Sequence, residues 1–408
     1  MPKALVLGNG SMLIGYDPRG QVRDFYFPHV GLENHAGGNC VHRIGVFVDG
    51  RFSWFDDPSW TISVNYRPET LASDIRAVNH VLELEIEFLD VVYNEKDIFL
   101  RRTTVRNRAT RSRSVKIFFH QQFQIYNTPR GDTAFFHPDL HAVIHYKGPR
   151  IFVVGGQTDN RTFDDYSIGI FSIEGKEGTW KDAEDGILEK NPIEHGSVDS
   201  VIGYTLSFQP LEEEQLVYWV TASKTIQEAM ELQHYIIEKT PDHLIETTQD
   251  FWHAWVNKLD FTFYGLDPSV VDLFKKSLLI IRTHVDNHGG VIASGDSDML
   301  QYGRDTYAYV WMRDSSFIIL ALDKAGYGDV TRRFFEFANE VLAEGGYFYH
   351  KYRPDRALGT SWHPWIREGK KQLAIQEDET ALVLYALWEH YKIRRDLEFI
   401  EGIYNSLI

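Results

Sequence analysis

The fold of the first half of the chain is decided by the stretch Val81-Leu82-Glu83-Leu84-Glu85-Ile86-Glu87-Phe88, in which apolar and acidic residues alternate. A period of two residues is typical of a β-strand that buries one face and exposes the other. The same period continues in Phe99-Leu100-Arg101-Arg102-Thr103-Thr104-Val105 and in Val115-Lys116-Ile117-Phe118-Phe119. Many short strands at this spacing predict an antiparallel β-sandwich over residues 1–224.

The apolar period changes near Thr225, and residues 225–264 are predicted to form a helical linker. Residues 265–408 then carry apolar positions at helical spacing, which predicts an all-helical second domain. We expect one helix over 315–324, capped by Asp314. We expect another over 379–394, with a buried face made of Ala381, Leu384, Leu387, Trp388 and Tyr391. The expected fold class is therefore a β + α multidomain protein.

Length and charge limit the classes of function. A chain of 408 residues favours two domains, and a formal net charge of −16 disfavours nucleic acid or an anionic membrane surface as a partner. The single Cys40 excludes an intrachain disulfide. We find no apolar run long enough for a signal peptide or for a membrane span of about 20 residues. These features predict a cytoplasmic protein that acts on a neutral ligand.

Three well-known functional motifs are incomplete or absent in this sequence. Gly8-Asn9-Gly10 is followed by Leu13 where a dinucleotide fingerprint needs glycine. His284 and His288 are four residues apart, but the glutamate of a metalloprotease motif and a third ligand are missing, so capping or core roles are favoured. A Gly-x-Ser-x-Gly elbow is absent. We therefore expect no cofactor and no metal.

A polar and aromatic cluster, Tyr307-Ala308-Tyr309-Val310-Trp311-Met312-Arg313-Asp314, points to a sugar pocket. Aromatic rings stack on the apolar face of a pyranose, while Arg and Asp pair with its hydroxyls. The second cluster, Gln376-Glu377-Asp378-Glu379, and the loop Ser361-Trp362-His363-Pro364-Trp365 add polar and aromatic groups. The predicted substrate-binding residues are Tyr307, Trp311, Arg313, Asp314, Trp362, Trp365, Gln376 and Glu377.

Structural roles compete with this interpretation. Asp314 could simply cap a helix with Trp311 as a hydrophobic staple, and the 376–379 cluster could cap the next helix. A guanidinium in an aromatic setting is more than a cap requires, so we favour a sugar site for Arg313. The loop that holds Trp362 and Trp365 is equally compatible with a packed Ω-loop.

The chain resembles glycoside hydrolase family 15, the glucoamylase-like enzymes, in their bacterial and archaeal form. The matching motifs are Asp24-Phe25-Tyr26-Phe27-Pro28-His29-Val30-Gly31, Glu33-Asn34-His35, Trp311-Met312-Arg313-Asp314 and Gln376-Glu377-Asp378-Glu379-Thr380-Ala381. The resemblance implies a β-sandwich before an (α/α)6 barrel. It also implies that Arg313 and Asp314 grip a terminal glucose in a subsite lined by Tyr307. The implied reaction is inverting removal of α-linked glucose from an α-glucan, a maltooligosaccharide or trehalose.

The second half of the chain departs from this family pattern. Inverting hydrolysis needs two carboxyls about 6.5–9.5 Å apart, and neither family context occurs before Ile408. Trp388-Glu389 has suitable residue types but lies within an expected helix, and the chain after Gly265 has room for roughly six helices of twelve. We therefore expect an N-terminal portion of a longer enzyme, which pairs with a C-terminal polypeptide or with itself. The alternatives are an inverting disaccharide phosphorylase and a non-catalytic carbohydrate-binding or regulatory protein.

Overall fold

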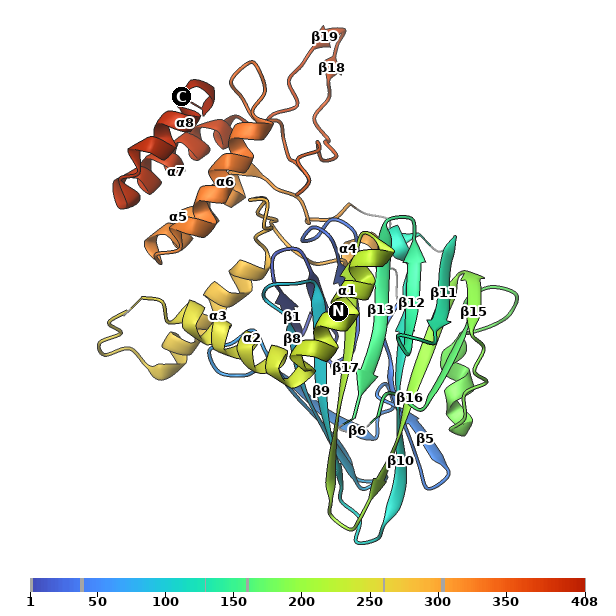
Figure 1. Ribbon diagram of the computed structural model, residues 1–408. Coiled ribbons are helices and arrows are strands. Elements are labelled where there is room, and N and C mark those ends of the chain that lie inside the picture. Colours follow the sequence, from blue (N-terminus) through green and yellow to red (C-terminus); the bar gives the residue numbers. More distant parts are fainter. Residues whose placement is uncertain are drawn as a thin grey trace. The chain divides into compact units, whose positions relative to one another are not determined.

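A computed structural model describes residues 3–36, 40–128, 130–158, 161–259, 261–301 and 305–407. The chain divides into two compact units, one rich in strands and one rich in helices (Figure 1). Unit 1 comprises Met1–Pro28 and Glu33–Trp255, and unit 2 comprises His29–Leu32 and Val256–Ile408. The helices of the segment 225–264, which we expected as a linker, thus lie in unit 1 up to Trp255.

The described residues of unit 1 form three sheets. A three-stranded sheet contains β1 (Leu5–Gly8), β2 (Leu13–Tyr16) and β3 (Val22–Tyr26). A five-stranded sheet has the order β14 (Asp165–Ile170), β16 (Val198–Phe208), β10 (Arg113–Gln122), β4 (Ile44–Val48) and β5 (Arg51–Trp54). A nine-stranded sheet has the order β15 (Ile193–Gly196), β11 (Asp132–His137), β12 (Ala142–Lys147), β13 (Arg150–Gln157), β17 (Glu213–Ser223), β9 (Ile98–Asn107), β8 (Leu84–Val92), β7 (Ser73–Asn79) and β6 (Trp60–Tyr66). Short 3₁₀ helices occupy Ile125–Asn127 and Thr179–Asp185.

The pairings described between these strands are antiparallel, which confirms the predicted sandwich class. Strand β8 shows why the alternation was informative, because its apolar members Leu84, Ile86 and Phe88 are buried. The strand nevertheless begins three residues later than the alternation. The side chain of Asn79 accepts hydrogen bonds from the backbone of Val81 and Leu82, and this holds the preceding residues in a turn.

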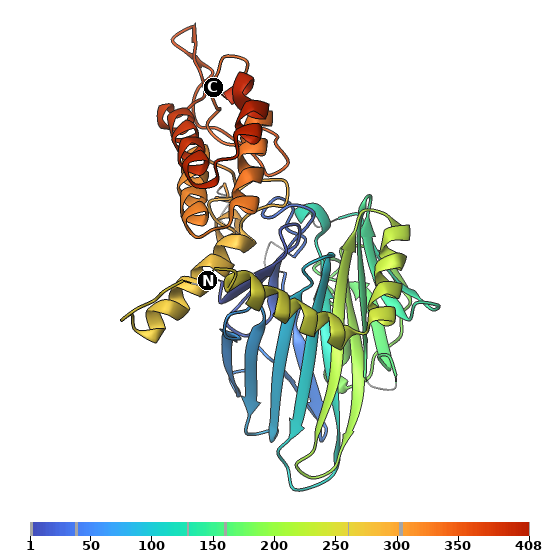
Figure 2. The same cartoon turned by 60° about the vertical axis from the view of Figure 1, so that its left-hand side comes forward.

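Helices α1 (Ile226–Lys239) and α2 (Pro241–Val256) cover one face of the nine-stranded sheet (Figure 2). Helix α1 begins where the sequence predicted, because the side chain of Thr225 caps it by accepting from the backbone of Glu228. The apolar faces of both helices pack on strands β9 and β17. The residues of this core include Leu100, Val217, Trp219, Leu232, Ile236, Leu244 and Ile245.

Unit 2 has six helices among its described residues, the number expected from chain length. They are α3 (Pro268–Thr283), α4 (Asp298–Gln301), α5 (Met312–Lys324), α6 (Gly328–Val341), α7 (Glu377–Arg394) and α8 (Leu397–Leu407), with a hairpin of β18 (Ile366–Arg367) and β19 (Lys370–Lys371). Helices α5, α6 and α7 pack on one another (Figure 2). Among the described residues, every helix is too short or too polar to span a lipid bilayer.

The start of helix α5 corrects the sequence analysis. The helix begins at Met312 rather than at residue 315, and Trp311 occupies the N-cap position. Asp314 lies in the first helical turn and is not the cap. A sequence pattern does not distinguish the two positions well, because an acidic side chain is favoured at both by the positive end of the helix dipole.

The buried face of helix α7 also differs from the prediction. The buried residues are Glu379, Val383, Ala386, Leu387 and His390, so only Leu387 was assigned correctly. Leu384 and Trp388 are instead exposed by 39% and 56%. Apolar residues occur on both faces of this helix, and a helical period cannot decide between two apolar faces.

Candidate functional site

Arg313 connects the N-terminal ends of helices α5 and α7. It lies in the first turn of α5 and donates from Nη1 to Oε1 of Gln376, the N-cap residue of α7, over 2.6 Å. The same guanidinium lies 3.3 Å from Asp314, 3.5 Å from Asp378 and 3.9 Å from Glu379. One cation is thus shared by an amide and three carboxyl groups.

The capping alternative is wrong for Asp314, whereas the 376–379 cluster does begin helix α7. Trp311 and Gln376 occupy the N-cap positions, and neither side chain makes a capping hydrogen bond. The side chains of Arg313 and Asp314 remain exposed by 32% and 42%. They form an ion pair with each other, yet part of each group stays open to a ligand from solvent.

Glu379 is a buried carboxyl beside this cation. Burial raises its pKa to about 8, and the guanidinium of Arg313 and the backbone amide of Met312 only partly oppose this effect. Neither carboxyl oxygen makes a hydrogen bond of good geometry to another described residue. At neutral pH the group therefore holds a proton that it could donate.

Aromatic rings surround a second, buried cation in the neighbouring loops. Trp311 is buried, with the ring of Tyr307 5.8 Å and that of Tyr309 6.0 Å from it. The ammonium of Lys351 lies 4.2 Å from the ring centroid of Tyr309, 4.9 Å from that of Trp311 and 5.2 Å from that of Trp362. These cation–π contacts hold the three rings in one cluster.

The neutral ring of His350 joins this cluster to the loop after it. The indole Nε1 of Trp311 lies 3.3 Å from His350 Nε2, and His350 Nδ1 lies 3.1 Å from Ser361 Oγ. Because an indole N–H can only donate, Nε2 accepts, and the proton of the neutral ring is on Nδ1. Burial, assisted by the positive charges of neighbouring residues, lowers the pKa of His350 to about 4.

Asp305 ties the two loops together. It pairs with Lys351 at 3.0 Å and accepts from the hydroxyl of Tyr309 at 3.1 Å. It also accepts from the hydroxyl of Thr360. The loop that carries Trp362 is therefore anchored to the loop that leads into helix α5.

The structure gathers most of the predicted substrate-binding residues into two neighbouring groups. Arg313, Asp314 and Gln376 meet at the helix ends. Tyr307, Trp311 and Trp362 meet around His350 and Lys351. Exposure of 51% for Tyr307 and 67% for Trp362 leaves ring surface for stacking on a sugar.

Two predicted residues stand apart from these groups. Glu377 is exposed, and the described contacts of Arg313 go to Asp378 and Glu379 instead. Trp365 packs beside Tyr349, with ring centroids 5.4 Å apart. Both remain predicted substrate-binding residues, but the described contacts do not join them to Arg313.

Sequence reasoning missed His350 and Lys351 as members of the site. It named Glu379 only together with Glu377 and Asp378, as carboxyls to test for chemistry if the chain is active by itself. Glu379 lies four residues before Val383 and eight before Leu387, so the three residues share the buried face of α7. The pair His350-Lys351 lies in an irregular loop without a recognisable motif. Only the fold brings it to the aromatic residues.

The sequence of the chain is similar to those of glycosyl hydrolases. Residues 272–359 match the family model of glycosyl hydrolases family 15. An uncharacterized glycosyl hydrolase of Methanocaldococcus jannaschii is 23% identical over 409 residues, which cover 98% of this chain and 62% of the relative. Trehalase 2 of Sulfolobus acidocaldarius is 29% identical over 157 residues, which cover 34% of this chain and 27% of that protein.

Solved structures share the fold. A bacterial glucoamylase complexed with acarbose matches with a TM-score of 0.76 and 15% identity, over 100% of this chain and 57% of the other. A putative kojibiose phosphorylase from the human microbiome matches with a TM-score of 0.63 and 10% identity, over 99% and 56%. The chain thus spans 57% of the glucoamylase and 62% of the archaeal relative.

The similarity to glucoamylase confirms the predicted class of a β-sandwich followed by helices of an (α/α)6 barrel. The family model covers most of α3 and all of α4, α5 and α6, together with the Trp311–Asp314 motif. The chain is thus similar to glycosyl hydrolases family 15 over residues 272–359, to an archaeal glycosyl hydrolase over nearly its whole length, and to a bacterial glucoamylase in fold.

Proposed function

We propose that the chain provides the glucose-binding part of an inverting, exo-acting α-glucoside hydrolase that releases glucose from non-reducing ends. The observation that supports this most is the position of Arg313, half-buried at the paired ends of α5 and α7. A guanidinium offers five N–H donors, and Gln376 takes one of them in a short hydrogen bond. The three contacts to carboxyls are 3.3–3.9 Å long, so sugar hydroxyls could replace them at little cost.

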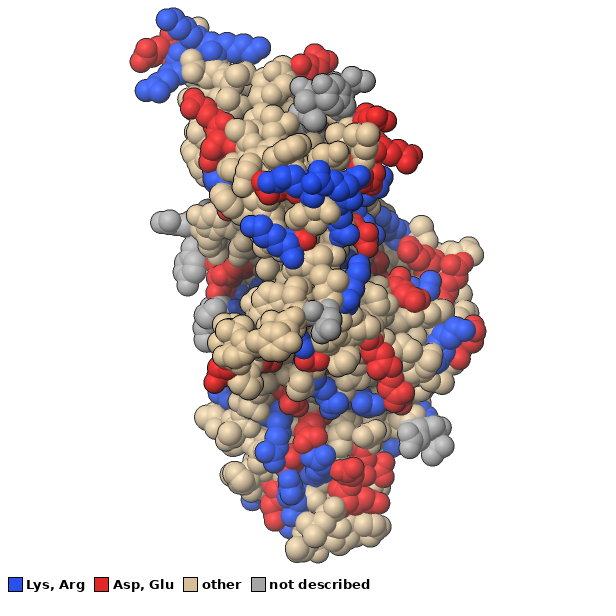
Figure 3. All heavy atoms as spheres, turned by 90° about the vertical axis from the view of Figure 1, so that its left-hand side faces the viewer, with Lys and Arg blue, Asp and Glu red and all other residues tan. Residues whose placement is uncertain are grey.

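In the proposed complex, hydroxyls of a terminal glucose accept from Arg313 and donate to Asp314 and Asp378. The exposed rings of Tyr307 and Trp362 would stack on its apolar face. A neutral saccharide is compatible with the net charge of −16. On the face that Figure 3 shows, acidic and basic side chains are interspersed rather than gathered in one acidic area.

The carboxyls that perform the chemistry are not assigned to residues of this chain. The relatives that match it are longer, and their activities belong to those whole proteins. If this chain releases glucose by itself, Glu379 is the first carboxyl to test as the acid, because its raised pKa keeps it protonated at neutral pH.

Binding of acarbose, maltose and trehalose, measured by titration calorimetry, tests the proposal. Arg313→Ala should weaken binding about 100-fold, because it removes charge-assisted hydrogen bonds. Asp314→Asn should weaken it less. Arg367→Ala, an exposed arginine of β18, serves as the matched control and should bind as the unmodified chain does. Unchanged affinity in Arg313→Ala would count against the proposal.

A phosphorylase is the second candidate, because the fold is shared with a putative kojibiose phosphorylase over 99% of this chain. Assays with and without inorganic phosphate separate the two. Release of free glucose without phosphate favours the hydrolase, whereas formation of glucose 1-phosphate favours the phosphorylase. Saccharide binding without either product favours a carbohydrate-binding or regulatory protein.

We further propose that the protein acts in the cytoplasm, which is compatible with its single, buried cysteine. Association with a second polypeptide or a second copy stays a prediction. We would expect such a contact on the exposed apolar residues of helix α7, which are Leu384, Tyr385 and Trp388.

A further inference from the structure

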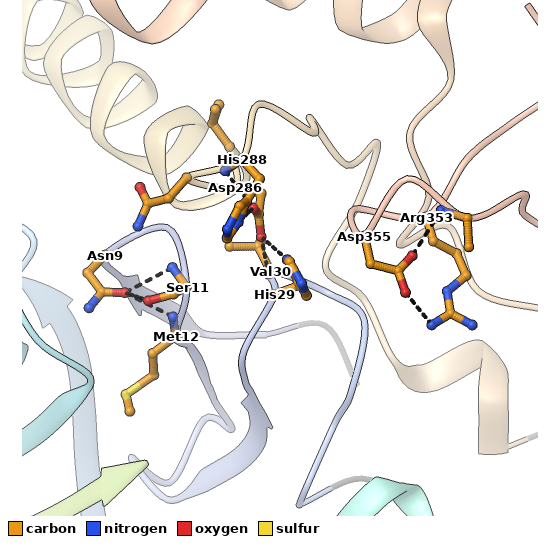
Figure 4. A network of polar contacts seen from close by, with 12 residues as sticks. Asn9, Ser11, Met12, His29, Val30, Asp286, His288, Arg353 and Asp355 are labelled. Carbon is orange, nitrogen blue, oxygen red and sulfur yellow. Dashed lines mark hydrogen bonds and ion pairs between the residues drawn. The ribbon is translucent and has the colours of Figure 1, made fainter. Parts of the chain in front are cut away.

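Three metal-ligating side chains meet in unit 2, away from the residues discussed above. They are His29, Asp286 and His288, and they offer ligand atoms that all lie within 4.8 Å of one another. The two histidines approach the carboxylate of Asp286 from opposite ends, as Figure 4 shows. His29 Nδ1 lies 3.2 Å from Oδ2, and His288 Nδ1 lies 2.8 Å from Oδ1.

The carboxylate at the centre is fixed and ionised. Asp286 has a fully buried side chain and accepts from the backbone amides of Val30 at 3.0 Å and His288 at 2.8 Å. Burial alone would raise its pKa, but hydrogen bonds from His288 and His29 outweigh burial and lower the pKa below its ordinary value. A buried, ionised carboxylate between two imidazoles attracts a cation.

The spacing also suits a metal ion. Zinc binds imidazole nitrogen and carboxylate oxygen at about 2.0–2.2 Å, so tetrahedral ligand atoms lie about 3.4 Å apart. The 3.2 Å between His29 Nδ1 and Asp286 Oδ2 is close to this value, whereas the 2.8 Å between His288 Nδ1 and Oδ1 is a hydrogen-bond distance that would lengthen when an ion binds. The side chain of His288 is 49% exposed and that of His29 is 18% exposed, so an ion could enter from solvent and keep a water molecule as its fourth ligand.

We propose that His29, Asp286 and His288 form a binding site for a divalent transition-metal ion, with Zn²⁺ as the best match. Two imidazoles and one carboxylate favour zinc, cobalt or nickel over the hard cations magnesium and calcium. The site is independent of the glucose-binding proposal, because none of its residues contacts Arg313 in the described part of the chain.

One neighbouring charge opposes metal binding. Arg282 donates to the backbone oxygen of Val285 and to Oδ1 of Asn287, which keeps its guanidinium close to the loop. Burial and the nearby Arg333 lower the pKa of Arg282 to about 10, while Asp286 opposes this shift. Because the positive charge of Arg282 repels a metal ion, we expect a dissociation constant for Zn²⁺ of about 1–10 µM. A structural site with four protein ligands would bind more tightly.

The metal would join two segments that are far apart in the sequence. Gly31 follows the His29 segment with φ +79°, and a Cβ atom there would come within 2.8 Å of Ile292. On the other side, the backbone oxygen of Val291 accepts from Ser315 in the first turn of α5 at 3.2 Å. Zinc bound at His29 and His288 would therefore fasten residues 29–32 to the loop that supports α5.

This proposal differs from the expectation, drawn from the sequence, that no metal is bound. From the sequence, the partner of His288 would have been His284, four residues earlier. In the structure His284 instead directs Nδ1 toward the backbone oxygen of Ile280 at 3.0 Å and toward Thr283. The third ligand, His29, comes from the other end of the chain and could not be found by spacing.

Zinc titration of the EDTA-treated, dialysed chain at pH 7.5 tests the proposal. Calorimetry should show one saturable site, and excess Zn²⁺ should raise the melting temperature by about 3 °C or more. His29→Ala and His288→Ala should each weaken binding at least about tenfold. Because His288 is half exposed, its replacement is not expected to impair folding.

Two control variants make the result specific. His284→Ala tests the pair that the sequence suggested, and His195→Ala removes an exposed histidine of unit 1. Both should bind zinc as the unmodified chain does. The proposal is overturned if no saturable site is found, if His288→Ala keeps full affinity, or if either control loses it.

Discussion

Two arginines with acidic partners, Arg101 in unit 1 and Arg313 in unit 2, show how the same chemistry serves different ends. Arg101 is 3% exposed and makes two hydrogen bonds to Asp90, at 2.9 and 2.7 Å, and a third to the backbone of Gly20. The positive charge of Arg101 is thus balanced by the single negative charge of Asp90. Arg313 is 32% exposed and is shared among three carboxyls at longer distances.

The difference indicates which pair is structural and which is available for a ligand. The buried pair is joined by two short hydrogen bonds, so removing one partner leaves an isolated charge in the core. Around Arg313 the acids outnumber the cation, and its contacts are long enough to be exchanged. A polar ligand with both donors and acceptors could add hydrogen bonds around Arg313. The same ligand would have to break the pair of Arg101 and Asp90.

The largest effect is expected from Arg101→Ala. It should destabilise unit 1 by about 3–5 kcal/mol, because Asp90 would remain buried and unpaired. Urea unfolding followed by tryptophan fluorescence measures the loss. Replacing both partners, Arg101→Met with Asp90→Leu, should recover part of the stability. A loss below about 1 kcal/mol in Arg101→Ala would show that the buried pair is not structurally important.

A smaller, pH-dependent effect is expected from Glu379→Gln. The pKa of about 8 lies above the ordinary value of 4.5, so the folded chain holds a proton that the unfolded chain releases between these pH values. Folding is therefore favoured below pH 4.5, and this contribution is lost as pH rises through about 8. Glu379→Gln cannot ionise and should be more stable than the unmodified chain at pH 8.5 by about 2 kcal/mol.

At pH 4.5 the two proteins should differ little, and this comparison is the internal control. Unfolding curves at both pH values measure the effect. If the difference between variant and unmodified chain does not grow with pH, Glu379 does not carry a raised pKa.

The aromatic residues of the long loop give a third prediction. Trp362 joins the cluster of His350 and Lys351, whereas Trp365 packs on Tyr349. Trp362→Ala should weaken saccharide binding about tenfold, which is about 1.4 kcal/mol. Trp365→Ala should have a smaller effect. Equal losses in calorimetric titrations would mean that the two residues do not differ in the way that their packing suggests.

The smallest effect is expected for Arg313→Ala on stability. A half-exposed ion pair contributes little to folding, so the free energy of unfolding should change by less than about 1 kcal/mol. Urea unfolding beside Arg101→Ala measures the contrast directly. A loss as large as that of Arg101→Ala would assign Arg313 a structural role.

The sequence predicted the sandwich, the change to helices and the polar clusters, because each depends on a local pattern. The strand start near Leu84 was missed, since a side chain, Asn79, stabilises a turn there. The buried face of α7 was assigned wrongly because apolar residues lie on both of its faces.

The sequence predicted only those residues of the candidate site that belong to a recognisable motif. Arg313 and Gln376 lie in two separate motifs, and the resemblance to a known family suggested that they belong to one site. His350 and Lys351 have no motif, and His29 comes together with His288 only through the fold. Contacts between segments distant in the sequence depend on packing, which local periodicity does not encode.

Calorimetric titration of acarbose into the unmodified chain and into Arg313→Ala tests the central claim most directly. We predict saturable binding of one molecule to the unmodified chain and a loss of about 100-fold in the variant, with both proteins equally stable. Equal affinity in the two proteins, or no binding to the unmodified chain, would contradict the account.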